Sequence, residues 1–165
     1  MITTLTKEDK AIIKEAKDKK VSGEIYSEDG LRLLKVLSNP EYIEVKNGVK
    51  AICDEALQGL DNLREVVLPT SVTDLGKRAF ASCHSLFKIT MPGVEFIGKE
   101  SFAHCESLKE MILPETLEKI WDGTFAGCKA LEQINIPCHM KVIDQSAFRD
   151  SGLKSLDIKI SDGCK

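Results

Sequence analysis

The sequence predicts an α/β solenoid, a right-handed superhelix of about five stacked coils with a parallel β-sheet on its concave face and a helix-plus-hairpin cap at the N-terminus. Three observations support this fold. A segment recurs every 22 or 23 residues, each copy ends in a short strand pattern, and the first 40 residues lack the repeat. At 165 residues, the chain is long enough to bury the core of one ordinary domain.

The chain is predicted to begin with a helix. Lys, Glu and Ala dominate the region, and Thr6 with Asp9 forms an approximate capping box, so we expect a helix over about 6–20. Its apolar face is narrow. Gly23 is expected to end it, because glycine is favoured just beyond the last helical turn.

A hairpin is predicted to follow the helix. Asp29-Gly30 is a strong turn signal between two apolar segments, which indicates paired strands over about 24–36. The exposed end of a solenoid needs a cover, and a helix with a hairpin supplies one. We therefore divide the chain into an N-terminal cap at 1–40 and a repeat array at 41–165.

Each repeat contains an aromatic position that is followed three residues later by cysteine. Two weaker copies flank three full ones, and the aromatic position advances by 23, 22, 23 and 23 residues. A coil of this length cannot bury its apolar side chains alone, so the coils are expected to stack with like positions in register. The five pairs are Leu57 with Leu60, Phe80 with Cys83, Phe102 with Cys105, Phe125 with Cys128, and Phe148 with Ser151.

Each copy continues into the phrase L-x-x-[VILM]-x-[LMI], whose final alternation predicts a short strand. Proline follows in four of the five copies and ends the strand, because it cannot donate to a ladder. A second apolar pair, such as Met140 with Ile143, forms another inward-facing corner. In the coil of Val94 and Ile97 this pair comes one residue sooner. A half-coil over 42–52 precedes the first full copy.

The combined phrase I-x-x-x-A-F-x-x-C-x-x-L-x-x-I-x-L-P closely resembles the BspA-like, or Treponema pallidum type, leucine-rich repeat over residues 42–158. The resemblance implies a leucine-rich-repeat solenoid, and half-coils often open such arrays in the family. It also implies a bacterial surface protein that takes part in adhesion to host matrix or to other cells.

The side chains that point out of the predicted concave sheet form the candidate binding site. Val67, Thr90 and Ile112 are in register, and Phe87 lies nearby, so an apolar stripe with a charged rim is our hypothesis for a protein-binding patch. The alternative is that β-branched residues stand there because strands favour them. The candidate partner-binding residues are Glu65, Val67, Phe87, Lys88, Thr90, Lys109, Glu110, Ile112, Gln133 and Asn135.

The six cysteines contain no C-x-x-C pair and predict no metal site. Those at the repeat position are expected to form a core ladder without disulfides, since equivalent side chains on stacked coils point in parallel. Cys53, Cys138 and Cys164 lie outside the ladder. We expect them to be unpaired thiols and leave their reactivity open; so many free thiols suit a reducing compartment.

The remaining patterns predict no enzyme, no cofactor and no metal. His84 and His104 stand at different offsets from the aromatic position, and no G-x-S-x-G, glycine-rich phosphate loop or H-E-x-x-H occurs. A net charge of -3 with mixed signs along the chain leaves no basic block for nucleic acid. The apolar runs are far shorter than the roughly 20 residues of a membrane helix.

We therefore expect a non-catalytic protein-interaction module that binds a protein ligand on its concave face. A structural unit that self-associates through its open C-terminal coil is one alternative. A carbohydrate-binding module is another, although six Phe, two Tyr and one Trp provide few platforms. The N-terminus lacks the apolar stretch of a secretory signal, so a cytoplasmic location is the default; the resemblance implies the cell surface or secretion if a signal was removed.

Overall fold

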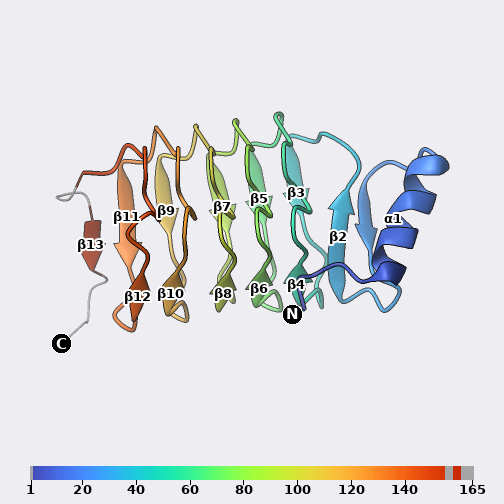
Figure 1. The fold of residues 1–165 in the computed structure, drawn as a ribbon, viewed down its shortest axis with the longest axis horizontal. Coiled ribbons are helices and arrows are strands. Elements are labelled where there is room, and N and C mark those ends of the chain that lie inside the picture. The colour runs from blue at the N-terminus through green and yellow to red at the C-terminus, as the bar shows by residue number, and fades with distance from the viewer. Residues whose placement is uncertain (1, 155–157, 161–165) are drawn as a thin grey trace.

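The computed structural model describes residues 2–154 and 158–160. The chain is a β-solenoid of about five stacked coils with one helix at its N-terminal end, as predicted (Figure 1). Helix α1 (Lys7–Asp18) is followed by an antiparallel hairpin of β1 (Glu24–Tyr26) and β2 (Arg32–Val36). Within the described residues, no helix has the length and apolar character needed to cross a membrane.

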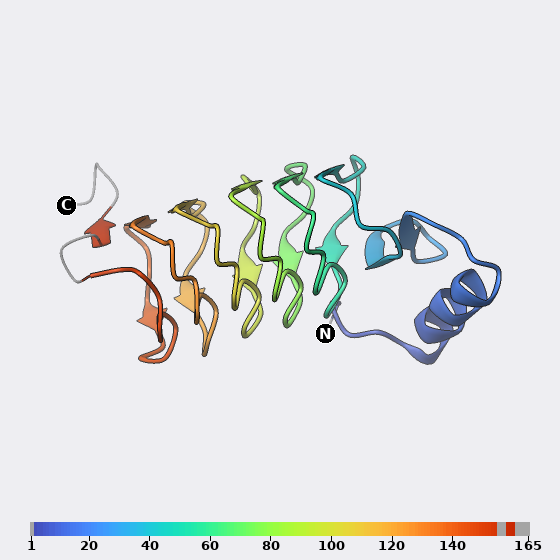
Figure 2. The same ribbon diagram turned by 90° about the horizontal axis from the view of Figure 1, so that it is seen from above.

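The strands of the coils stack in two ladders along the solenoid, and every pair between coils is parallel (Figure 2). The strands of the first ladder contain the end of the repeated phrase L-x-x-[VILM]-x-[LMI]. This ladder is the sheet that was predicted to carry the binding face. It consists of β3 (Tyr42–Glu44), β5 (Glu65–Val67), β7 (Lys88–Thr90), β9 (Glu110–Ile112), β11 (Gln133–Ile136) and β13 (Ile158–Ile160). The second ladder consists of β4 (Ala51–Ile52), β6 (Asp74–Leu75), β8 (Phe96–Ile97), β10 (Lys119–Ile120) and β12 (Val142–Ile143).

Both ladders are interrupted at the same junction between coils. In the first ladder, β3, β5 and β7 form one sheet, and β9, β11 and β13 form another. In the second, the sheet that begins with the hairpin ends at β8, and among the described residues β10 pairs only with β12. Figure 1 shows the wider spacing between β7 and β9. The strand stack is therefore divided in two near its middle.

The break follows the one coil that is a residue short. The return loop between Pro92 and Ile97 lacks one residue relative to its equivalents. A Cβ added at Gly93 in this loop would collide with the backbone of Thr70, so the loop packs directly on the preceding coil. We attribute the separation of β7 from β9 to this shortened loop, which draws its coil toward the N-terminal side.

The aromatic position forms a third edge, which is continuous across the same junction. The ring centroids of Phe80 and Phe102 are 5.3 Å apart, and the next two pairs, to Phe125 and then Phe148, are 5.6 and 5.5 Å apart. The N–H of Phe80 also donates to the carbonyl of Ser101 at 2.8 Å. This aromatic corner holds the coils together where their strands separate.

The cysteines of the repeat form the predicted core ladder. Cys83, Cys105 and Cys128 are buried free thiols. Each donates to a main-chain carbonyl of the preceding coil, as Cys105 Sγ does to Phe80 at 3.2 Å. Burial raises the pKa of Cys83 and Cys128 to about 12 and that of Cys105 well above its ordinary value. These thiols act as small core side chains with a weak donor.

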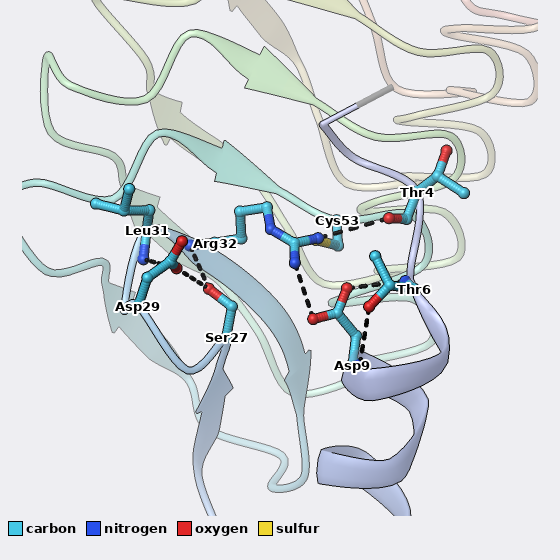
Figure 3. Close-up of polar contacts among 8 residues, drawn as sticks. All are labelled: Thr4, Thr6, Asp9, Ser27, Asp29, Leu31, Arg32 and Cys53. Carbon is cyan, nitrogen blue, oxygen red and sulfur yellow. Dashed lines mark hydrogen bonds and ion pairs between the residues drawn. The ribbon is translucent and has the colours of Figure 1, made fainter.

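A partly buried ion pair connects the helix to the hairpin (Figure 3). Thr6 and Asp9 form the predicted capping box, with N–H to side-chain oxygen distances of 2.9 and 3.1 Å. Arg32 Nη2 lies 2.8 Å from Asp9 Oδ1. Burial by itself raises the pKa of Asp9, but hydrogen bonds from Thr6 and Arg32 outweigh it and hold that pKa below its ordinary value. The ionised carboxylate therefore stabilises the folded cap.

Two expectations about the ends of elements were wrong. The helix ends at Asp18, before Gly23, because Lys20 adopts a left-handed conformation with φ 54°. Ile143, expected to face inward with Met140, is 42% exposed. Its strand pairs only with β10 among the described residues, so no further strand covers it.

Of the three outlying cysteines, Cys138 differs from what we expected. Cys138 is disulfide-bonded, so the expectation of an unpaired thiol there was wrong. It is exposed and lies on the turn that follows β11. Cys53 is free and buried, and burial raises its pKa to about 11, which favours the protonated thiol at neutral pH. Cys164 lies outside the described residues.

Candidate partner-binding surface

The outward side chains of the first ladder lie on one face but in two groups, because the ladder is interrupted. Lys88 Nζ lies 3.7 Å from Glu65 Oε1 across β5 and β7. On one side of the break, Glu65 is in register with Lys88, and Val67 with Thr90. On the other side, Glu110 is in register with Gln133, and Ile112 with Asn135.

A hollow of about 880 Å³ opens on this face between β7 and β9. It lies over the junction at which the ladder is broken. Predicted residues that do not line it are Glu65, Val67, Gln133 and Asn135; those that do are Phe87, Lys88, Thr90, Lys109, Glu110 and Ile112.

The hollow has an apolar centre. Phe87 and Ile112, on opposite sides of the break, are 45% and 63% exposed. Ile89 is only half-buried, although its equivalents in neighbouring coils, Val66 and Met111, are buried. The separation of the strands has therefore uncovered a core position, and the hollow extends toward the solenoid interior.

The charges around the hollow are mostly positive. Arg64, Lys88 and Lys109 line it, with Glu110 as the acidic residue among them. The Arg64 guanidinium carbon lies 5.5 Å from the centre of the Phe87 ring, a cation–π arrangement that braces the aromatic side chain. An anionic ligand would meet an excess of cations here.

Within the described residues, the main chains of β7 and β9 are not hydrogen-bonded to each other. Between β5 and β7, the N–H of Phe87 donates to the carbonyl of Arg64 at 3.0 Å. One coil on, the equivalent bond would run from the N–H of Lys109 to the carbonyl of Phe87. In the part of the chain that the structure describes, neither this bond nor any other backbone bond joins β7 to β9. Two strand edges therefore face the hollow.

Sequence reasoning did not select several residues of this site. Arg64, which points outward, lines the hollow, as do the half-buried Ile89 and the core residue Met91, which is itself buried. Tyr42, on the same face at β3, is 51% exposed. The sequence signal for the hollow was the residue missing from one return loop. The repeat pattern alone does not show that this missing residue would interrupt strand pairing.

The other polar groups carry structural roles. Among residues 2–154, no group of three or more His, Cys, Asp and Glu side chains is placed to hold a metal ion. His84 Nδ1 instead lies 2.8 Å from Asp61 Oδ1 of the preceding coil. In the cap, Ser27 donates to Asp29 at 2.6 Å, and Asp9 pairs with Arg32, so these four side chains are bonded within the cap (Figure 3).

Comparisons with known proteins agree on the repeat. The model of the BspA type leucine-rich repeat region matches residues 36–154 in six copies. A leucine-rich cell surface protein from Faecalibacterium prausnitzii is 31% identical with a TM-score of 0.77, over 85% of this chain and 38% of that one. The T. pallidum leucine-rich repeat protein is 27% identical with a TM-score of 0.71, over 79% of this chain and 65% of that one.

A leucine-rich repeat protein from Bacteroides ovatus, 23% identical with a TM-score of 0.56 over 68% of this chain and 35% of that one, shares the fold. A search of curated proteins gave no match. The chain thus spans 38% and 65% of the length of the first two solved structures.

Proposed function

The chain belongs to the BspA-type leucine-rich-repeat family, and on that premise we propose that it is a non-catalytic interaction module that binds a protein partner on the outward face of its first ladder. The observation that carries the proposal is the pair of large exposed apolar side chains, Phe87 and Ile112, on either side of a hollow with a charged rim. An apolar centre within a polar rim is the usual composition of a protein-binding patch.

We place this function at the cell surface. The Faecalibacterium prausnitzii protein, 31% identical, is described as a cell surface protein. The disulfide at Cys138 supports the same location, because disulfides persist in oxidising compartments. This proposal replaces the reducing compartment that unpaired thiols had favoured. Attachment to another protein outside the cell is the role that fits both observations.

The division of the chain remains part of the proposal: residues 1–40 act as a cap and 41–165 as the binding array. Ile13 and Ala16 of the helix pack in one apolar cluster with Ile25 and Leu34 of the hairpin. The hairpin in turn starts the second ladder through the parallel pairing of β2 with β4. This arrangement closes the N-terminal end of the core.

Capture experiments test the proposal. Immobilised protein is exposed to extracellular matrix extract and to cell lysate, and the retained proteins are identified by mass spectrometry. The Phe87→Ala, Ile112→Ala double variant is expected to lose the specific partner without a change in unfolding midpoint. The control, Tyr42→Ala, removes an equally exposed side chain from the same face away from the hollow and should retain it. Equal capture by the double variant contradicts the assignment of this face.

A second candidate function is self-assembly through the C-terminal coils. Val142 and Ile143 are 43% and 42% exposed on the last strand of the second ladder, where a second copy of the chain could pack. Sedimentation velocity over a range of protein concentrations tests this idea. A monomer at every concentration contradicts it, and loss of a dimer in a Val142→Lys variant supports it.

A further inference from the structure

We propose that the junction at which β7 separates from β9 is a hinge, and that the C-terminal coils swing there about the aromatic corner. The inference concerns the free protein, so it goes beyond the proposed function and does not rest on it. Its basis is the unequal distribution of contacts around this one junction.

The corner side of the junction is held by several polar contacts and one ring stack. Three amides of the coil that precedes the junction donate to carbonyls of the coil that follows it: Arg78 to Lys99 at 3.0 Å, Phe80 to Ser101 at 2.8 Å, and Ser82 to Ala103 at 2.8 Å. Arg78 Nε also lies 2.7 Å from Glu100 Oε2, and the rings of Phe80 and Phe102 are stacked. These contacts fix one edge of the two coils relative to each other.

The strand sides of the junction lack backbone bonds in the residues that the structure describes. One coil earlier, the N–H of Phe87 donates to the carbonyl of Arg64 in the first ladder at 3.0 Å. In the second ladder, the N–H of Phe96 donates to the carbonyl of Thr73, also at 3.0 Å. Because both ladders lack such bonds at the junction, the backbone does not restrain the distance between β7 and β9 or between β8 and β10.

A side-chain hydrogen bond joins the two coils at the return loop, which lies between the two strands of each coil and away from the corner. Thr116 Oγ1 donates to the carbonyl of Val94 at 2.7 Å. The equivalent hydroxyl of Ser71 donates to the carbonyl of Val49 at 2.8 Å, but at that junction the strands of both ladders pair as well. A single neutral hydrogen bond is a weak restraint, so Thr116 acts as a latch that opens and closes.

The second ladder also changes its packing at this junction. Gly76 and Gly98 occupy one repeat position, and a Cβ added at either would collide with the backbone of the preceding coil. Their amides donate to the carbonyls of Ile52 and Leu75 at 2.8 and 2.9 Å. Trp121 occupies the same position in the next coil, and its Cβ prevents an equally close approach. The closest packing of coils on this side therefore ends where we place the hinge.

The hinge changes the width of the hollow. Phe87 and Ile112 lie on opposite sides of the junction, and Ile89, which lines the hollow, is half-buried. Opening about the corner moves β9 away from β7 and exposes more of Ile89, whereas closing covers it. Motion about a few persistent contacts is the usual form of a hinge, and it takes place in microseconds to milliseconds.

Distance distributions from double electron–electron resonance test the hinge on the whole free protein. Nitroxide labels are attached through p-acetylphenylalanine, which avoids the native cysteines. One pair of labels replaces Asp61 and Lys129 on the corner side. A second pair replaces Thr70 and Lys141 at the return loops of the same two coils, and all four residues are exposed. We expect the return-loop distribution to be at least about twice as broad as the corner distribution. Equal widths, or a broader corner distribution, overturn the hinge.

Variants of Thr116 test the latch with each pair of labels in place. Thr116→Val removes the hydroxyl but keeps the shape of the side chain, so the return-loop distribution should shift to longer distances while the corner distribution stays unchanged. Thr116→Ser retains the hydroxyl and should match the parent. An unchanged return-loop distribution in Thr116→Val overturns the latch. A shift of both distributions overturns the hinge, because the coils would then loosen as a whole.

Discussion

The aromatic corner and the first ladder respond differently to the same irregular coil. At the junction after the shortened loop, Phe80 and Phe102 remain stacked with centroids 5.3 Å apart, whereas no backbone hydrogen bond joins β7 to β9 in the described structure. The two regions belong to the same pair of coils. The comparison teaches that coil contact is maintained by the buried corner, while strand pairing on the exposed face can be lost locally.

This difference separates the parts that stabilise the solenoid from the part proposed to bind. Phe80, Phe102 and Phe125 of the corner are fully buried, so their contacts contribute to folding in proportion to the apolar surface removed from water. The open face retains exposed apolar side chains and unbonded edges, which a partner can cover.

The largest effect is expected at the corner. Phe102→Ala removes a buried ring stacked on both neighbours and should lower the free energy of unfolding by about 3–5 kcal/mol, measured by chemical denaturation. Phe87→Ala, with the same change of side chain on the open face, should stay within about 0.5 kcal/mol of the parent. Comparable losses in the two variants would remove the distinction between corner and face.

The N-terminal cap also stabilises the solenoid, because it closes the N-terminal end of the second ladder. It therefore extends the comparison between stabilising regions and the exposed face. Asp9→Asn disrupts its partly buried ion pair with Arg32 and should cost about 2 kcal/mol at pH 6. Asp18→Asn on the same helix affects an exposed pair and should cost less than about 0.5 kcal/mol.

The difference between the parent and Asp9→Asn should depend on pH. The folded-state pKa of Asp9 lies below its ordinary value, so the carboxylate stabilises the fold above the unfolded pKa, and this contribution is lost as pH falls through the lower, folded value. Denaturation curves from pH 6 downward should show the two proteins converging below about pH 4. A constant difference across that range contradicts the assigned role of the carboxylate.

A smaller effect is expected when the shortened loop is lengthened. Insertion of Thr between Gly93 and Val94 restores a 23-residue coil and should allow β7 to pair with β9, with a gain of about 1 kcal/mol. A crystal structure of the variant would reveal the bond from Lys109 N–H to the Phe87 carbonyl. The same insertion between Glu115 and Thr116 overlengthens a regular coil and should destabilise it. An unchanged break in the first variant contradicts the cause we assign to it.

Most of the fold could be predicted from the sequence, because a regular repeat indicates which positions of neighbouring coils lie in contact. Positions such as Phe102 and Cys105 recur in register, and stacking is the arrangement that buries them all. The capping box at Thr6 and Asp9 is equally local and was also predicted correctly.

The hollow could not be predicted in the same way. Its cause is one missing residue near Gly93, whose effect depends on how the loop packs against Thr70 of another coil. The half-exposure of Ile89 is a result of that packing, since its pattern matches buried equivalents. The disulfide at Cys138 likewise depends on tertiary proximity, which spacing does not encode.

Residue-resolved amide hydrogen exchange of the free protein tests the central claim most directly. Phe87, Lys109 and Glu132 occupy one repeat position; the amides of Phe87 and Glu132 donate to the preceding coil at 3.0 and 2.8 Å, and that of Lys109 does not. We predict strong protection of Phe87 and Glu132 and rapid exchange at Lys109. We also predict strong protection of the corner amide of Phe80, which donates across the junction to the carbonyl of Ser101. Protection of Lys109 equal to that of its two equivalents would contradict the account, because the strand edges would then be closed.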